Sequence, residues 1–259
     1  MNPYDYEGDL DPELFEDLGG DAGELEQSGD FLEEGQDWIS EDGADLASEL
    51  DPELFEDSSA TGSGSQIPDG KTPLPGTTEK RRSHTTNPPY QSQPGQRDVK
   101  TYNYVLDQFA VGVNPRYAHA KGATWCNIYL WDVTRAMGAE IPHWVDKSGN
   151  PVAVGQGNEL SANATNAWLH KYGSRFGWQK VTLDQAVTAA NMGCPAVVSW
   201  KNPGGHGHVA MIRPSQPTSQ GPWMAQAGRI NSSWVRMYRG GSQKGIFGKG
   251  AALTFFIHD

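Results

Sequence analysis

The chain has 259 residues, enough for one or two domains, and a formal net charge of −12 at pH 7. This charge is an average over two different parts, because residues 1–70 hold 23 of the 32 acidic residues and no Lys or Arg, whereas residues 71–259 hold all 20 basic residues and 9 acidic ones. Such a division excludes a single uniform globular chain. Two cysteines, Cys126 and Cys194, are too few for a disulfide framework.

The N-terminal part reads as a disordered acidic leader over 1–60, because its net charge is high and its apolar residues are scattered. The eight residues Leu-Asp-Pro-Glu-Leu-Phe-Glu-Asp occur twice, at 10–17 and 50–57. A repeated Leu-Phe pair among acids favours a docking peptide for a delivery or injection machinery. The alternative is a duplicated solvating tail. Residues 61–97 are rich in Ser, Gly, Pro and Thr, which is typical of a linker.

The first residues contain neither a basic region nor an apolar run, so we expect no Sec signal peptide. No apolar stretch approaches the ~18 residues of a membrane span. We therefore expect synthesis in the cytoplasm, followed by action on the cell envelope after lysis or after non-Sec, injection-type secretion.

From residue 98 the apolar content rises, which predicts one compact domain over 98–259. A short amphipathic element at 102–109 and a turn at 114–117 come first. Helices are then predicted at 126–138, 159–172 and 182–192, from apolar spacing and from Thr182, Gly138 and Gly193 as caps and ends. The pattern next changes to strands at 195–200, 208–213, 223–227, 234–238 and 251–258. Helices followed by an antiparallel meander predict an α+β fold.

Cys126 is the leading candidate for chemistry, because it stands directly before a helical pattern. A helix N-terminus offers unpaired N–H groups and partial positive charge, which favour a thiolate and an oxyanion. We therefore expect a lowered pKa for this thiol. Cys194 lies between Gly193 and Pro195 at a helix exit, and we interpret it as structural. The neighbours Trp125 and Asn127 are expected in the oxyanion region or the cleft.

The partner base is expected to be His208, which opens a predicted strand, with His206 nearby in a Gly-rich turn as a residue of the cleft. A third residue should orient the imidazole. Gln226 is the polar side chain within the next strand, and Asn231 is the alternative third member. The pair His206 and His208 also has the spacing of two metal ligands, but no third ligand has a suitable position, so we expect neither a metal nor another cofactor.

Three segments, 124–144, 158–178 and 195–214, resemble bacterial and phage peptidoglycan amidohydrolases of the papain-like group that includes NlpC/P60 and CHAP domains. The resemblance implies a papain-like α+β fold with N-terminal helices packed on an antiparallel sheet. It matches Cys126 to the nucleophile, His208 to the base, and Gln226 or Asn231 to the third position. It also implies cleavage of amide bonds in peptidoglycan stem peptides.

Two other functions stay open at this point. One is a papain-like toxin, acting as a protease, deamidase or acyltransferase on host proteins, and the other is a catalytically inactive wall-binding module. The positive charge of the C-terminal part favours anionic polymers such as bacterial envelopes. Nucleic acid is not an expected partner, because no binding motif is present and the aromatic residues have core spacing.

Overall fold

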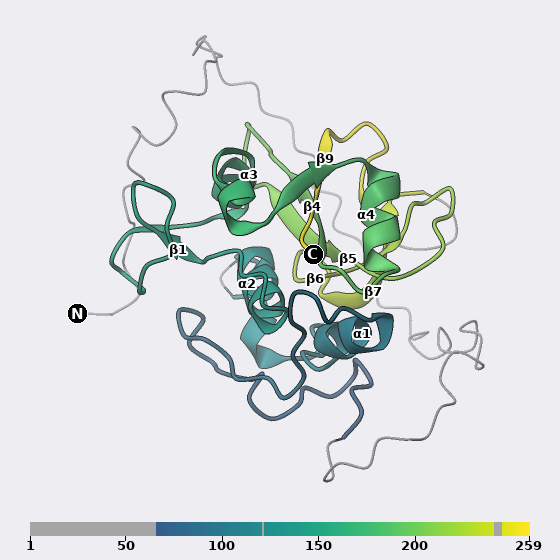
Figure 1. Ribbon diagram of the computed structural model, residues 1–259, viewed down its shortest axis with the longest axis horizontal. Helices are drawn as coiled ribbons and strands as arrows, with labels where there is room; N and C mark the ends of the chain where they lie inside the picture. Colours follow the sequence, from purple (N-terminus) through teal and green to yellow (C-terminus); the bar gives the residue numbers. More distant parts are fainter. Residues whose placement is uncertain (1–65, 121, 241–244) are drawn as a thin grey trace. The chain divides into compact units, whose positions relative to one another are not determined.

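The structure is a computed structural model that describes residues 66–120, 122–240 and 245–259 (Figure 1). The predicted leader over 1–60, with both copies of its repeat, lies outside the described residues, as do residues 61–65. Within the ranges that the structure describes, none of the helices has the length and apolar character of a membrane span. Residues 66–259 belong to one compact unit.

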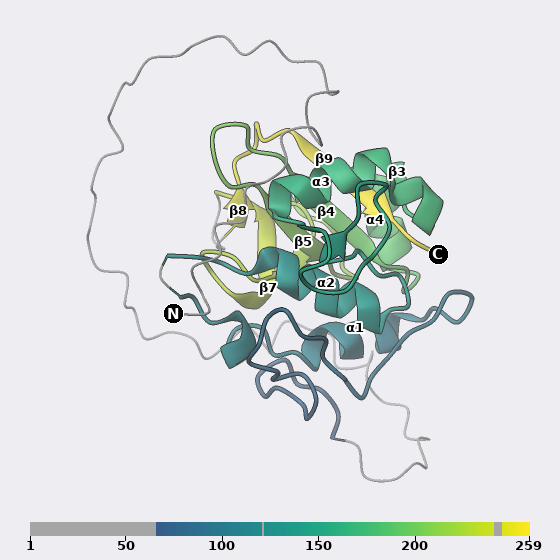
Figure 2. The same cartoon turned by 90° about the vertical axis from the view of Figure 1, so that its left-hand side faces the viewer.

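The unit combines helices and strands, as the predicted α+β class requires (Figures 1 and 2). The helices are α1 (Val99–Asp107), η3 (Pro115–Tyr117), α2 (Cys126–Ala136), α3 (Ala162–Lys171), η4 (Gly173–Phe176) and α4 (Leu183–Ala190). The strands are β1 (Trp144–Val145), β2 (Asn158–Glu159), β3 (Gln179–Val181), β4 (Ala196–Trp200), β5 (His208–Ile212), β6 (Trp223–Gln226), β7 (Ser232–Tyr238), β8 (Gly245–Phe247) and β9 (Leu253–Ile257).

Local sequence explains where most helices begin. The side chains of Asp98, Ser161 and Thr182 accept hydrogen bonds from backbone N–H groups in the first turns of α1, α3 and α4. Thr182 and Gln185 complete a reciprocal capping box, which confirms the predicted start of the third long helix. Gly138, with φ of 60°, lies just beyond α2 in the left-handed conformation that favours glycine.

The seven-stranded sheet has the order β3-β9-β4-β5-β6-β7-β8. The prediction of an antiparallel meander is wrong in two respects. The last strand, β9, pairs with both β3 and β4 instead of following β7, and β8 pairs with β7 in parallel. The consecutive strands β4, β5, β6 and β7 do form antiparallel neighbours. Helix α2 packs against β5 and β6, and α3 packs against β4 and β5.

Residues 66–97 contain no helix or strand, but they pack against the rest of the unit. Leu74 and Thr77 are buried there. The buried Arg116 guanidinium donates to the carbonyl oxygens of Glu79, Arg81 and His84 at 2.8, 3.1 and 2.9 Å. The composition predicted a linker over 61–97 and did not predict this packing, because irregular chain that is fixed through backbone carbonyls leaves no apolar periodicity.

Asp132 of α2 in turn holds the Arg116 guanidinium that binds these carbonyls. The Arg116 Nε to Asp132 Oδ2 distance is 2.6 Å, and both side chains are excluded from solvent. Thr86 also donates to Asp132, and Arg135 donates to the Thr86 carbonyl at 2.9 Å. Removing one member of a buried ion pair costs about 3–5 kcal/mol. Residues 79–86 are therefore held against α2, the helix that begins with Cys126, through Arg116, Asp132 and Arg135.

Candidate functional site

Cys126 is the first residue of α2, and its side chain is buried. The backbone N–H groups of Cys126, Asn127 and Val209 act on its sulfur in the direction that lowers the pKa, which favours the thiolate. Burial outweighs them and raises the pKa of the Cys126 thiol above its ordinary value. The expected lowering of this pKa is therefore wrong for the resting protein, because desolvation penalises the charged form more than these donors stabilise it.

The contact with Val209 joins the two elements that the sequence singles out. Val209 follows His208 in β5, the strand on which α2 packs, and its backbone N–H lowers the pKa of the Cys126 thiol. His208 is the first residue of β5 and pairs with Trp200 of β4. The helix start and the strand start are thus neighbours, although 82 positions separate Cys126 from His208 in the sequence.

His208 is held in an apolar environment that favours its neutral form. Burial lowers the pKa of His208 from 6.5 to about 4, and the nearby Gln226 amide opposes that shift only in part. The ring lies against Phe247 of β8, with a centroid distance of 5.7 Å. The Nε2 atom of His208 is buried and has no hydrogen-bond partner among the described residues.

Gln226, at the end of β6, is fully buried beside the imidazole. Its Nε2 donates to the carbonyl of Ile230, and its Oε1 has no hydrogen-bond partner within the described part of the chain. Gly228 lies between the two side chains. A Cβ at this position would collide with Gln226 Oε1 and would lie 2.8 Å from His208 Cε1. Only a glycine therefore allows the amide and the imidazole to approach this closely.

Asn231, the alternative third member, has a different position. Its Nδ2 donates to the carbonyl of Tyr117 at 2.7 Å, which ties the turn after β6 to η3. The Oδ1 of Asn231 is buried and lacks a hydrogen-bond partner among the residues described. Gln226 is the amide that influences the pKa of His208, so the geometry favours Gln226 over Asn231 as the group that orients the ring.

The other expected cleft residues lie at different places around Cys126. Trp125 is partly exposed, and its Nε1 donates to the Ala118 carbonyl at 2.9 Å. The side chain of Asn127 donates to the Leu160 carbonyl at 3.0 Å, so its backbone N–H is the group that faces the sulfur. His206 is exposed in the loop before β5, where its carbonyl accepts from Asn202.

His119 is a neighbour of the site that sequence reasoning missed. Its Nε2 lies 2.5 Å from the carbonyl oxygen of Gly228, the residue that separates His208 from Gln226. A carbonyl only accepts, so His119 carries a proton on Nε2. Two hydrogen bonds thus join residues 117–119, which precede α2, to the turn after β6. His119 donates to Gly228, and Asn231 donates to Tyr117. The position of Gly228 directly after a predicted strand was the available signal for a close backbone approach.

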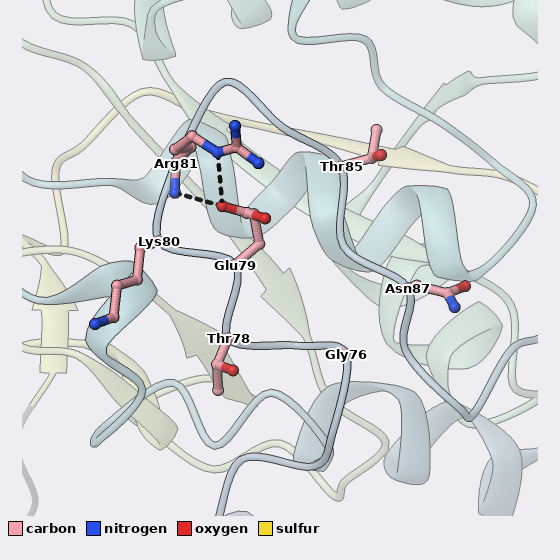
Figure 3. A pocket seen from close by; sticks show the side chains of 7 residues that line it. All are labelled: Gly76, Thr78, Glu79, Lys80, Arg81, Thr85 and Asn87. Carbon is pink, nitrogen blue, oxygen red and sulfur yellow. Dashed lines mark hydrogen bonds and ion pairs between the residues drawn. The ribbon is translucent and has the colours of Figure 1, made fainter.

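A separate hollow of about 570 Å³ lies in the N-terminal segment (Figure 3). It is lined by Gly76, Thr78, Glu79, Lys80, Arg81, Thr85 and Asn87. Glu79 and Arg81, which both line it, form an ion pair at 3.2 Å. None of the predicted site residues lines this hollow. Within the described ranges, no group of three His, Cys, Asp or Glu side chains has the arrangement of a metal site.

No protein-family model matches the chain, and no curated protein matches it.

Proposed function

We propose that the chain is a cysteine amidohydrolase or peptidase that cleaves amide bonds in the stem peptides of peptidoglycan, and that residues 98–259 form a papain-like domain. The observation that carries the proposal is that α2, whose first residue is Cys126, packs against β5, whose first residue is His208. It places a thiol at a helix N-terminus beside the strand that begins with a histidine. The sequence resemblance of the same segments to wall-lytic enzymes supplies the substrate class.

The resting pair is a neutral thiol and a neutral imidazole, because burial raises the pKa of Cys126 and lowers that of His208. His208 removes the thiol proton as the sulfur attacks the carbonyl carbon, so charge develops only in the transition state. Backbone N–H groups at the start of α2 stabilise the oxyanion. The imidazolium then protonates the leaving amine, and water hydrolyses the thioester with His208 as base.

Gln226 has the orienting role in this mechanism. A neutral His208 carries one ring proton, and a hydrogen bond from Nε2–H to Gln226 Oε1 would leave Nδ1 to accept the proton of the thiol. Both atoms are buried without a partner in the described structure, so such a bond would satisfy two polar groups at once. Buried polar groups of this kind are otherwise costly to leave unpaired.

The net positive charge of residues 71–259 supports an anionic polymer as substrate. Access to peptidoglycan requires that the protein reach the envelope, either after lysis or through an injection-type route in which the acidic leader is the address.

The test is the release of peptides from purified sacculi by Cys126→Ala, with Cys194→Ala as the matched control. We expect Cys126→Ala to lose more than about 1,000-fold in rate with its melting temperature retained, and Cys194→Ala to keep wild-type activity. Mass spectrometry of the released fragments identifies the bond. Undiminished lysis by Cys126→Ala contradicts the proposal. Products from protein substrates but none from sacculi would favour the toxin, and a catalytically silent wild type would favour the binding module.

A further inference from the structure

Helix α2 begins without the side-chain cap that the other three α-helices have. Asp98, Ser161 and Thr182 cap α1, α3 and α4, but Trp125 makes no side-chain hydrogen bond to the first turn of α2. An ordinary cap at position 125 would accept from the N–H of the second or third helical residue, Asn127 or Ile128. The N–H of Asn127 instead acts on the Cys126 sulfur, where it favours the thiolate. A capping side chain would therefore compete with the nucleophile for its own donor.

Trp125 is fixed through its ring instead. Its Nε1 donates to the Ala118 carbonyl at 2.9 Å. The guanidinium of Arg82 lies over the indole, 3.9 Å from its centroid, and its Nη2 donates to the same carbonyl oxygen at 3.0 Å. The Nε of Arg82 donates to the Arg116 carbonyl, also at 3.0 Å. One planar cation thus stacks on the indole and shares its acceptor.

Arg82 comes from outside the helices and strands, but its backbone is fixed. Arg116 binds the carbonyls of Glu79, Arg81 and His84, on both sides of Arg82 in the sequence. Arg116 in turn pairs with the buried Asp132 of α2. The same helix therefore carries the nucleophile at its start and anchors, two turns later, the segment that delivers Arg82.

We propose that Arg82 is a positioning residue for the nucleophile. It holds Trp125 in place of a cap, so that the first turn of α2 stays ordered while its N–H groups remain directed at the sulfur and at the developing oxyanion. This inference rests on the proposed function and extends it, because it makes the side chain of Arg82 a required part of the catalytic unit. The contact is with Trp125 and backbone carbonyls, so Arg82 acts through Trp125.

The experiment compares Arg82→Ala with Arg81→Ala. Arg81 is the adjacent arginine, but its side chain is exposed and paired with Glu79 (Figure 3). We expect Arg82→Ala to lower kcat for sacculus hydrolysis between about 10-fold and about 100-fold, as for a misplaced nucleophile, with KM changed less than about twofold. Arg82→Lys keeps the charge but loses the planar fork, so its kcat should be intermediate. Arg81→Ala should match wild type.

The second readout is the pH dependence of iodoacetamide alkylation at Cys126, followed by mass spectrometry so that Cys194 is separated. Loss of the directed N–H donors should move the midpoint for Cys126 to higher pH in Arg82→Ala but not in Arg81→Ala. If Arg82→Ala does not fold at the assay temperature, Arg82→Gln takes its place in the comparison with Arg81→Ala. Identical kcat and identical alkylation profiles in the Arg82 and Arg81 variants would overturn the inference. A wild type without hydrolytic activity would overturn the proposed function. The alkylation profiles would still test whether Arg82 positions the first turn of α2 through Trp125.

Discussion

His208 differs from an exposed histidine because its neutral form is built into the fold. Phe247 lies against the ring, the Nε2 atom of His208 is buried, and burial lowers the pKa of His208 to about 4. The lowered pKa thus keeps the imidazole of His208 unprotonated over the whole physiological range. Burial also raises the pKa of the Cys126 thiol and so favours its protonated form, and under the proposed function the thiol proton would therefore move to His208 during attack.

The lowered pKa of His208 predicts acid sensitivity of the fold. Below pH 6.5 the unfolded chain binds a proton at His208 that the folded protein binds only near pH 4, so this contribution to stability is complete above pH 6.5 and is lost as the pH falls towards 4. Between pH 7 and pH 5 the linkage amounts to about 2 kcal/mol. Thermal unfolding should therefore show a larger fall in melting temperature for wild type than for His208→Gln.

The comparison between the two proteins is the control in this measurement, because the carboxylates titrate in both. His208→Gln is expected to be less stable at pH 7, and only the change with pH is informative. If the two stability curves ran parallel between pH 7 and pH 5, His208 would not be a half-buried imidazole that the fold keeps neutral.

At the scale of elements, α3 controls the loop that leads to His208. Asn163, in the first turn of α3, donates from Nδ2 to the carbonyls of Asn202 and Gly205 at 3.0 and 2.8 Å, and its Oδ1 accepts from the N–H of Asn202 at 2.9 Å. A Cβ on Gly207 would collide with that same oxygen and lie 2.6 Å from the Trp200 carbonyl. The side chain of Asn163 therefore fixes the loop up to Gly207, the residue before His208.

Asn163→Asp should separate this role from general stability. The change keeps Oδ1 as acceptor but replaces the Nδ2 amide group, which donates to two carbonyls, by an oxygen that cannot donate. The unpaired carbonyls should lower the free energy of unfolding by about 1–3 kcal/mol. We expect sacculus hydrolysis to fall at least about 10-fold. Asn191→Asp is the matched control, because Asn191 also holds a loop with both amide atoms, through the backbone of Ser215. An equal loss of activity in both variants would show that destabilisation alone is responsible.

The sequence was sufficient for elements with periodic or capped patterns. Helix α2 was predicted at 126–138 and ends at Ala136, and the predicted start of α4 at Thr182 is confirmed. The apolar pattern predicts the first element at 102–109, but α1 spans Val99–Asp107, because the Asp98 side chain caps the helix and starts it three residues earlier. Helix α3 begins at Ala162 and not at 159, since Asn158 and Glu159 pair with β1.

What could not be predicted depends on partners distant in the sequence. Strands β1, β2, β3 and β8 have two or three residues, too few for a period-two pattern, and their pairing defines them. The insertion of β9 between β3 and β4 is a property of the assembled sheet. At the site, Cys126, His208 and Gln226 carry recognisable chemistry, whereas Gly228, His119 and Arg82 contribute through backbone approach or a stacked ring, which only the folded chain brings together.

At the scale of the whole molecule, charge divides the chain at about residue 70. Residues 1–70 hold 23 acidic residues and residues 71–259 hold all 20 basic residues, and opposite charges on one chain attract each other at an effective concentration set by their connection. Residues 66–97 belong with the basic, folded part because they are packed there and supply Arg82. A deletion that removes the leader must therefore end at residue 65, because a deletion to about residue 95 would also remove Arg82, which stacks on Trp125.

Deletion of 1–65 should raise sacculus hydrolysis at low salt if the leader competes with the anionic substrate for the basic surface. We expect a gain of about 10-fold at low ionic strength that shrinks towards unity as added salt shortens the screening length to about 8 Å near 0.15 M. Deletion of 10–17 alone is the control, because it removes one repeat and 4 of the 23 acidic residues. A gain as large from this short deletion would assign the restraint to the repeat instead of to charge. Equal activity of the full chain and the 1–65 deletion at low salt would rule the restraint out and leave the leader as an address, which a pull-down with residues 1–60 tests directly.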